Sequence, residues 1–277
     1  MTNTTAENQF YFTPRNPFWQ MNREQVLLLG GGRVLLMQIA HPMVAEAVYN
    51  HSYVFKKPLL RLHRTLSLTF AIVYATKPEA DVAIAEIERA HRPAVGRLAD
   101  AVGKHAAGAS YNARNPRQGL WVWATLVEGA MSTYERLVAP VDLTVKEAFY
   151  ADSTTFAKLM GIHESLIPTS YQALVTYMQT AIDNEEIYIG EKARKLAPFV
   201  TAQSIPIVNG LSYPLFRFTV GLLPQDIRAQ YGYNFGKWEN KALNGFCATT
   251  RTLVSWLPSM VRYVAPYRRA MKIVDKL

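Results

Sequence analysis

Apolar residues recur three and four positions apart along most of the 277-residue chain, which is the spacing of amphipathic helices. No paired runs of alternating β-branched residues indicate strands. No repeat, low-complexity block or Gly/Ser-rich linker divides the chain. The pattern therefore predicts an all-α fold, a single multi-helix domain of eight to twelve helices.

Prolines, caps and the apolar period predict where these helices begin and end. The predicted helices span residues 22–40 (across the triplet Gly30-Gly31-Gly32), a short helix from 42, then 58–75, 78 to beyond 91, 116–138, 144–161, 170–182, 190–197, 225–231 and 238–256. Thr144 and Glu147 are interpreted as a capping box.

Three regions follow from this division. Residues 1–20 are predicted to be an extended N-terminal arm, because Pro14 and Pro17 oppose a helix. Residues 21–257 form the helical domain, and residues 258–277 form a basic, amphipathic C-terminal segment.

The composition limits the partners of the chain. Hydrophobic residues make up 49% and charged residues 18%, which favours an apolar interior or an apolar surface patch. The net charge is +9, but the basic residues are scattered until the C-terminal segment, so we expect no nucleic-acid partner. The basic C-terminal segment is instead a candidate for peripheral contact with a membrane.

Cysteine content and the N-terminal residues bear on location. The single cysteine, Cys247, excludes an intramolecular disulfide and a cysteine-based zinc site. Residues 1–8 are polar and lack the layout of a signal peptide. We therefore expect a cytoplasmic protein, peripheral to the membrane if the C-terminal segment binds lipid.

His91 is the most informative histidine. Helical spacing places it on one apolar face with Ile84, Ile87 and Leu98. A buried imidazole needs a partner, since leaving it unpaired costs about 1–3 kcal/mol. That partner is either a backbone carbonyl or a metal, and the spacing leaves both open.

A polar cluster opens the helix predicted over 58–75. Arg61 and Thr65 are four residues apart and share a face, with Arg64 beside them, whereas residues 65–75 carry no charge. An uncharged helix of this kind is expected to be central and buried. The cluster is either a solvent-exposed helix end or the polar end of an interior cavity.

A di-iron carboxylate bundle would require two Glu-x-x-His pairs. Glu88 and His91 form one such pair, and no other histidine has glutamate three residues before it. The glycine triplet lacks the lysine and hydroxyl residue of a phosphate loop.

An ordered set of motifs resembles the MpaB oxygenase and rubber oxygenase (latex clearing protein) family, also catalogued as DUF2236. The motifs are GRVLLMQIAHP at 32–42, His51-Ser52, PLLRLHRT at 58–65, His91, and LWVWATL at 120–126.

The resemblance implies a helical domain with a globin-like core that holds haem b and its iron. It implies that His91 is the metal ligand and that Arg61, Arg64 and Thr65 form the catalytic, cofactor-facing group on the opposite side. It further implies an oxidoreductase acting with dioxygen on an apolar, unsaturated or isoprenoid-like small molecule.

Three positions depart from the family pattern or match it loosely. Arg64 stands where the rubber oxygenase has lysine, and an always-protonated guanidinium is a poor iron ligand. Trp123 stands where many members have histidine. A glutamate is proposed as a catalytic base in the rubber oxygenase, and Glu46 is only a loose counterpart of it. His41 and His51 are interpreted as structural residues or as residues that support the site.

Two other functions remain open. One is a haem-binding carrier or sensor without catalysis. The other is a haem-free, membrane-peripheral protein that binds an apolar lipid.

Overall fold

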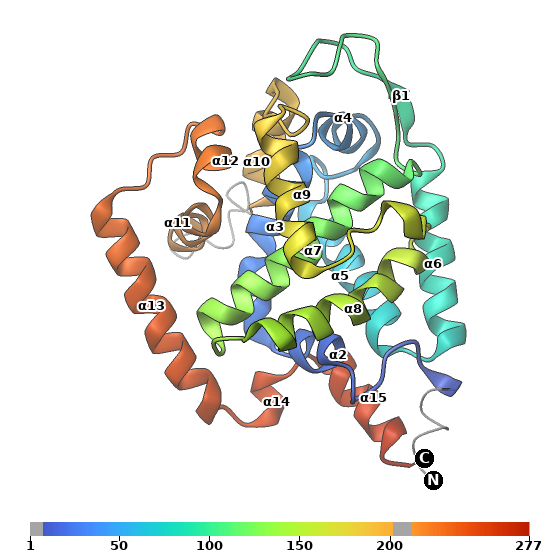
Figure 1. The fold of residues 1–277 in the computed structure, drawn as a ribbon, viewed down its shortest axis with the longest axis vertical. Coiled ribbons are helices and arrows are strands. Elements are labelled where there is room, and N and C mark those ends of the chain that lie inside the picture. The colour runs from blue at the N-terminus through green and yellow to red at the C-terminus, as the bar shows by residue number, and fades with distance from the viewer. Residues whose placement is uncertain (1–7, 202–211, 277) are drawn as a thin grey trace.

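The computed structural model describes residues 8–201 and 212–276. This part of the chain is a single domain, about 70% helical, with fourteen α-helices and one small sheet (Figure 1). The predicted all-α fold is confirmed. The helix count exceeds the prediction partly because short helices such as α2 and α14 give little periodic signal.

The N-terminal half contains α2 (Pro17–Asn22), the 3₁₀ helix η1 (Gln25–Gly30), α3 (Gly31–Ile39), α4 (Pro42–His51), α5 (Pro58–Tyr74), α6 (Lys77–His91) and α7 (Pro116–Leu137). The C-terminal half contains α8 (Leu143–Leu159), η2 (Glu164–Leu166), α9 (Tyr171–Asp183), α10 (Glu191–Val200), α11 (Ser212–Leu222), α12 (Gln225–Gln230), α13 (Lys237–Trp256), α14 (Ser259–Arg262) and α15 (Ala265–Val274). Strands β1 (Val95–Arg97) and β2 (Ser110–Asn112) pair antiparallel, with Gly96 opposite Tyr111.

Helix α7 is the centre of the fold and crosses the middle of Figure 1. Leu120, Trp123, Val127 and Leu137, spaced three or four residues apart or at multiples of that spacing, are buried, and Trp121 on a neighbouring face is buried as well. The Trp121 indole donates to the carbonyl of Met37 on α3 at 2.8 Å, and the Trp123 indole donates to the carbonyl of Ser153 on α8 at 3.2 Å. These bonds satisfy both buried indoles and fix α3 and α8 on two sides of α7.

Two glycines let η1 and α3 approach α7 closely. A Cβ at Gly30 would lie 2.2 Å from Thr133 Oγ1, and one at Gly129 would lie 2.4 Å from a methyl carbon of Val34. Neither distance is possible for a real side chain, so contact between these elements requires glycine at both positions. Gly31 differs, because a Cβ there would meet no atom within 4 Å.

The N-terminal region differs from the predicted extended arm. Phe10, Phe12, Phe18 and Trp19 are buried in the main core, and Pro17 opens α2. Proline is well accommodated at the first position of a helix, where its missing N–H is not needed. Four aromatic side chains supply enough apolar surface to hold this region on the domain.

The capping box predicted at Thr144 is wrong. Helix α8 is capped by Asp142, whose carboxylate accepts from the backbone N–H of Val145 at 2.9 Å. Glu147 instead accepts from the backbone N–H of Tyr171 at 2.8 Å, at the start of α9. Aspartate is as good an N-cap as threonine, and the local sequence does not distinguish them.

Helix α5 is less buried than predicted. Ile72, Val73 and Tyr74 at its C-terminal end are buried, but Thr65 and Ser67 are exposed. Serine and threonine carry no charge yet are well solvated, so an uncharged run does not guarantee burial on every side.

Helix α15 of the C-terminal segment is amphipathic, but its apolar face is already occupied. Tyr267 and Ala270 of α15 are buried, and α15 packs against α5. No single helix in the described ranges is long and apolar enough to cross a membrane, although the bent pair Gln25–Ile39 and Pro42–His51 meets that test on length and composition together.

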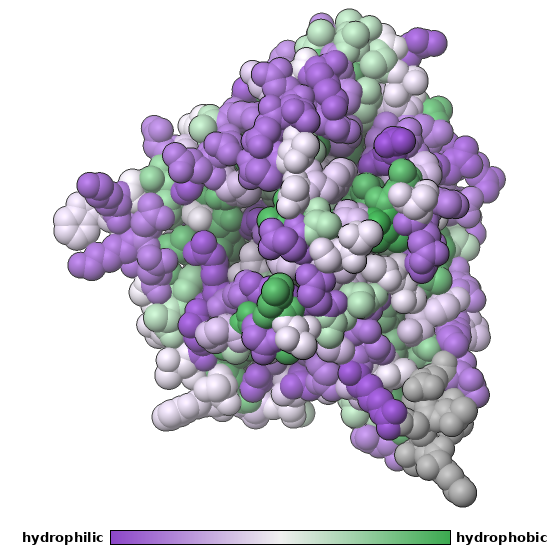
Figure 2. Space-filling model, in the orientation of Figure 1, coloured by the Kyte–Doolittle hydropathy of each residue, from purple (hydrophilic) through white to green (hydrophobic). Residues whose placement is uncertain are grey.

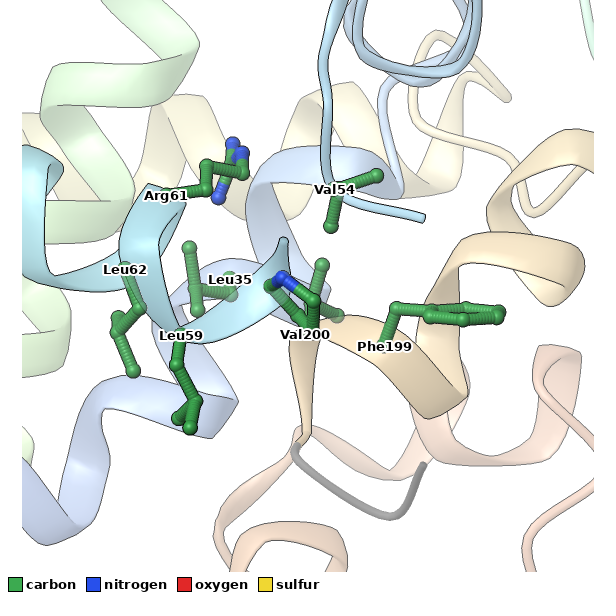
Figure 3. A pocket seen from close by; sticks show the side chains of 8 residues that line it. Leu35, Val54, Leu59, Arg61, Leu62, Phe199 and Val200 are labelled. Carbon is green, nitrogen blue, oxygen red and sulfur yellow. The ribbon is translucent and has the colours of Figure 1, made fainter. Parts of the chain in front are cut away.

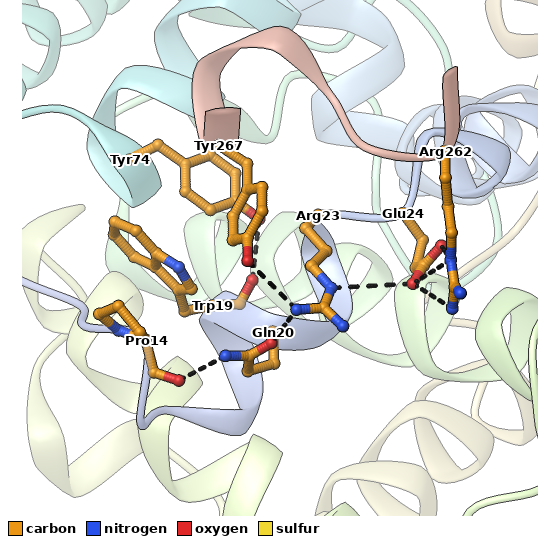
Figure 4. A network of polar contacts seen from close by, with 8 residues as sticks. All are labelled: Pro14, Trp19, Gln20, Arg23, Glu24, Tyr74, Arg262 and Tyr267. Carbon is orange, nitrogen blue, oxygen red and sulfur yellow. Dashed lines mark hydrogen bonds and ion pairs between the residues drawn. The ribbon is translucent and has the colours of Figure 1, made fainter. Parts of the chain in front are cut away.

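A buried ion pair ties the C-terminal segment to the N-terminal region (Figure 4). Glu24, only 2% exposed, accepts three hydrogen bonds of 2.9–3.1 Å from the guanidinium of Arg262. Arg23 lies 3.8 Å from the same carboxylate and also bonds the Tyr267 hydroxyl at 3.2 Å. Residues 238 positions apart are thereby held together.

We predict that Arg262→Ala destabilises the fold by about 3 kcal/mol, near the lower end for a broken buried ion pair, because Arg23 still partly compensates Glu24. Urea unfolding measures this change. Lys158→Ala is the matched control, since Lys158 and Glu164 form an exposed pair and its loss should cost about 1 kcal/mol or less. Equal losses in the two variants would contradict a special role for the buried pair.

Candidate active site

An apolar cavity lies between α5, α3, η1 and α7, with a volume of about 1070 Å³ that includes solvent at its mouth. Helix α5 contributes one face, with Leu62, Leu66 and Val73 among the lining residues. Trp123 and Val127 line the cavity from α7. The apolar period of α5 is therefore used to line a cavity as well as to fill a core.

A few polar side chains reach this cavity. The Thr65 hydroxyl donates to the carbonyl of Arg61 at 2.9 Å, and the Thr69 hydroxyl donates to the carbonyl of Thr65 at 2.9 Å. Gln38 also lines the cavity, and its side-chain amide makes no hydrogen bond within the described part of the chain. Gln38 is not among the residues predicted above, although it is the one polar residue between Val34 and Ile39.

Arg61 lies in a second, smaller recess of about 280 Å³ between α5, α3 and α10. In Figure 3 its guanidinium points away from Leu59 and Leu62. The Arg61 Nε donates to the Ser52 hydroxyl at 3.1 Å, and burial lowers the pKa of Arg61 below its usual value. Leu62 lines both the recess and the cavity, so it forms part of the wall between them.

Arg64 lies on the side of α5 that faces α6. Its guanidinium contacts the Glu86 carboxylate at 2.8 Å, and hydrogen bonds to Tyr53 and Glu86 raise the pKa of Arg64. Only two residues connect α5 and α6, and the helices pack against each other along their length. The N-terminal end of α5 therefore lies beside the C-terminal end of α6, which is the end that carries His91.

His91 is the last residue of α6, and its side chain is exposed, contrary to the predicted buried position. Ile84 and Ile87, which precede it on the same face of α6, do pack against the core. The predicted buried face of α6 is therefore correct, and only its C-terminal end, at His91, is exposed to solvent. Burial nevertheless lowers the pKa of His91, and its ring makes no hydrogen bond in the described residues. The protein around His91 displaces part of the water, but the imidazole ring stays accessible. This combination is typical of a recessed site on the surface.

The structure brings the predicted site residues to one end of the α5–α6 pair but not into one cavity. Thr65 lines the large cavity, Arg61 the small recess, and Arg64 the interface with α6. His91 lines neither hollow. Helical spacing predicted which residues share an end, and it could not predict on which side of α5 the space lies.

His41, His51 and Glu46, which the sequence offered as supporting residues, lie outside both hollows. His41 is buried and caps α4, accepting from the backbone N–H of Met43 at 3.2 Å. The His51 ring contacts the Tyr111 hydroxyl at 3.0 Å. Glu46 is buried and forms an ion pair with Lys192. All three line neither the cavity nor the recess.

Comparison with known proteins identifies relatives. A family model described as "ER-bound oxygenase mpaB/B'/Rubber oxygenase, catalytic domain" matches residues 18–254. Two curated mycobacterial proteins are each 24% identical over 157 residues: "Uncharacterized protein Mb2261" of Mycobacterium bovis and "Uncharacterized protein Rv2237" of Mycobacterium tuberculosis. The match covers 55% of this chain and 59% of each relative, so the chain spans about three-fifths of their length. No solved structure matches.

His41 generates a prediction for stability against pH. Burial, and to a lesser extent His105, lowers the pKa of His41 to about 4. Between pH 6.5 and 4 the unfolded chain binds this proton and the folded chain does not, so stability falls by up to about 3 kcal/mol as the pH drops.

Urea unfolding at several pH values measures this loss. In His41→Asn, which keeps a capping side chain without a titrating ring, the loss between pH 6.5 and 4 should be smaller by that amount. An unchanged pH dependence in this variant would show that another group is responsible.

Proposed function

Because the chain belongs to the MpaB and rubber oxygenase catalytic-domain family, we propose that it is a haem b-dependent oxygenase that acts with dioxygen on an apolar small molecule. Family membership supports oxygenase activity. The proposal goes beyond family membership in three respects: the use of haem, the identity of the iron ligand and the class of substrate. The observation that carries them is the imidazole of His91, which makes no hydrogen bond in the described residues and lies at the end of the α5–α6 pair where Arg61 and Arg64 also lie.

The residues present fit a haem in their chemistry. An imidazole binds iron in its neutral form, and the burial that lowers the pKa of His91 favours that form. No hydrogen bond in the described residues competes for the ring. Within the same residues, no three His, Cys, Asp or Glu side chains are grouped to hold a metal ion. An iron at His91 would therefore bring its other ligands with it, as a porphyrin does.

Arg61 and Arg64 fit the acidic groups of the same cofactor. Both carry a permanent positive charge and lie at the end of α5 that adjoins the end of α6. Guanidinium groups pair well with carboxylates such as haem propionates. In the present structure Arg64 is held by Glu86, so binding of an anionic group there would exchange one carboxylate partner for another.

The large cavity suits an apolar substrate. Its wall is formed mostly by aliphatic and aromatic side chains, which exclude water from a bound molecule. Thr65 supplies a hydroxyl at this wall, and its present acceptor is only the backbone carbonyl of Arg61. That hydroxyl can turn to donate to an oxygen on which negative charge develops.

A bound haem would supply redox-active iron for reaction with dioxygen. In this proposal His91 would bind the iron, Arg61 and Arg64 would hold the acidic groups, and Leu66 and Val73 would position the substrate. The predicted cytoplasmic location is part of this proposal and rests on the sequence alone.

We predict that protein reconstituted with haem shows a Soret band and that His91→Ala weakens haem binding at least about tenfold, because iron loses its protein ligand. Absorption titration with haem measures the affinity. The matched control is His63→Ala, since His63 is an exposed histidine at the same end of α5. A His91→Ala protein that binds haem as the wild type does would refute the ligand assignment.

Catalysis is tested by Thr65→Val, which keeps the shape of the side chain and removes the hydroxyl. We predict that it lowers oxygen consumption with a reactive apolar alkene at least about tenfold, the usual effect of losing a preorganised donor. Ser67→Ala, on the exposed side of α5, is the control. Haem-loaded protein that consumes no oxygen with any alkene would favour the carrier or sensor function. Protein that binds lipid but no haem would favour the lipid-binding function.

A further inference from the structure

Exposed apolar side chains are concentrated near the C-terminal end of the chain. Seven of the eighteen large hydrophobic residues that are exposed in the described ranges fall within residues 238–261, on α13, α14 and the turn between them. Trp238 is 82% exposed, Trp256 83% and Met260 75%. The other four are Phe246, Leu253, Leu257 and Val261. We call these seven residues the α13–α14 surface.

Most of this surface is one face of one helix. Trp238 and Trp256 are 18 residues apart, five full turns, so they project on the same side of α13 about 27 Å from each other. Phe246 and Leu253 lie between them along the helix but about 60–80° round from that side, and Phe246 also contacts Phe218 of α11. The opposite face carries Leu243, Cys247 and Val254, which are buried against α11 and the end of α7.

The position of α13 leaves this face accessible. In Figure 1 the helix runs along the left edge of the molecule, with α14 below it. In Figure 2 apolar residues (green) reach the surface over the left-hand side among polar ones (purple). Seven exposed large apolar side chains within 24 residues are unusual on a protein surface and mark a place of contact.

Charge identifies what this surface contacts. Residues 237–261, which carry this surface, contain three basic residues (Lys237, Lys241 and Arg251) and one acidic residue, Glu239. Glu239 already pairs with Arg217, whereas Lys237 and Lys241 have no carboxylate partner in the described residues. The Lys241 ammonium lies 5.8 Å from the ring of Trp238. The positive charge that borders this apolar surface is attracted by an anionic lipid surface.

We propose that the α13–α14 surface is a membrane-binding site and that its ligand is the interface of an anionic lipid bilayer. Helix α13 would lie flat in the plane of the interface, with Trp238 and Trp256 reaching past the headgroups to the upper part of the acyl chains and Phe246 and Leu253 nearer the protein. Lys237 and Lys241 would contact the acidic headgroups. The surface is separate from the proposed haem and substrate sites, so this proposal stands whether or not the chain is an oxygenase.

The tryptophans provide a direct test. Trp19, Trp121 and Trp123 are buried, so only Trp238 and Trp256 are accessible to a quencher in water. On addition of phosphatidylcholine vesicles that contain phosphatidylglycerol, we expect both to become protected from acrylamide and to be quenched by brominated acyl chains. In flotation with the same vesicles, Trp238→Ser/Trp256→Ser should bind at least about tenfold more weakly than the wild type.

The matched control is Val82→Ser/Leu143→Ser, which removes two exposed apolar side chains from α6 and α8 and should bind as the wild type does. High salt and pure phosphatidylcholine should both weaken binding of the wild type. Failure to bind the anionic vesicles would overturn the proposal. So would a doubling of the mass in sedimentation that Trp238→Ser/Trp256→Ser abolishes, because the surface would then be covered by a second copy.

Discussion

Helix α5 has to satisfy two neighbours at once, and the arrangement of the candidate site depends on how it does so. One face lines the apolar cavity through Leu62, Leu66 and Val73, while another packs against α6, where Arg64 meets Glu86. An amphipathic helix ordinarily buries one stripe and exposes the rest. In α5, the contact with α6 replaces part of the face that would otherwise be solvated. This contact places Arg61 and Arg64, near the start of α5, beside the C-terminal end of α6, where His91 lies.

The elements around this helix were predictable because strong local signals mark their ends. Pro58 opens α5, and Thr76 with Glu79 forms the capping box that starts α6. The cap of α8 was mispredicted because Asp142 and Thr144 are both good caps, and only the long-range contact of Glu147 with α9 decides between them. Local sequence signals therefore predict where the helices lie along the chain better than they predict which elements those helices contact.

The site was predictable only in part, for a related reason. Helical spacing brings Arg61, Arg64 and Thr65 together, but it does not say where the neighbouring helices end. His91 sits at the last residue of α6, where the buried face runs out, so its exposure depends on the surrounding fold. Similarly, the amphipathic pattern of α15 was correct, but its apolar face is used against α5. Exposed apolar side chains gather on α13 instead, next to the segment whose Arg262 reaches Glu24 at the cavity.

The glycines at the junction of η1 and α3 have a consequence for how this protein could change. Gly30 and Gly129 are fixed by close packing, because any side chain there would collide with α7 or α3. Gly31 lines the cavity, and a side chain there would meet nothing nearby. Its substitution by a larger residue would shorten the space available to a bound molecule without breaking a contact. The volume of this cavity can therefore change, by evolution or by design, at one position while the fold stays intact.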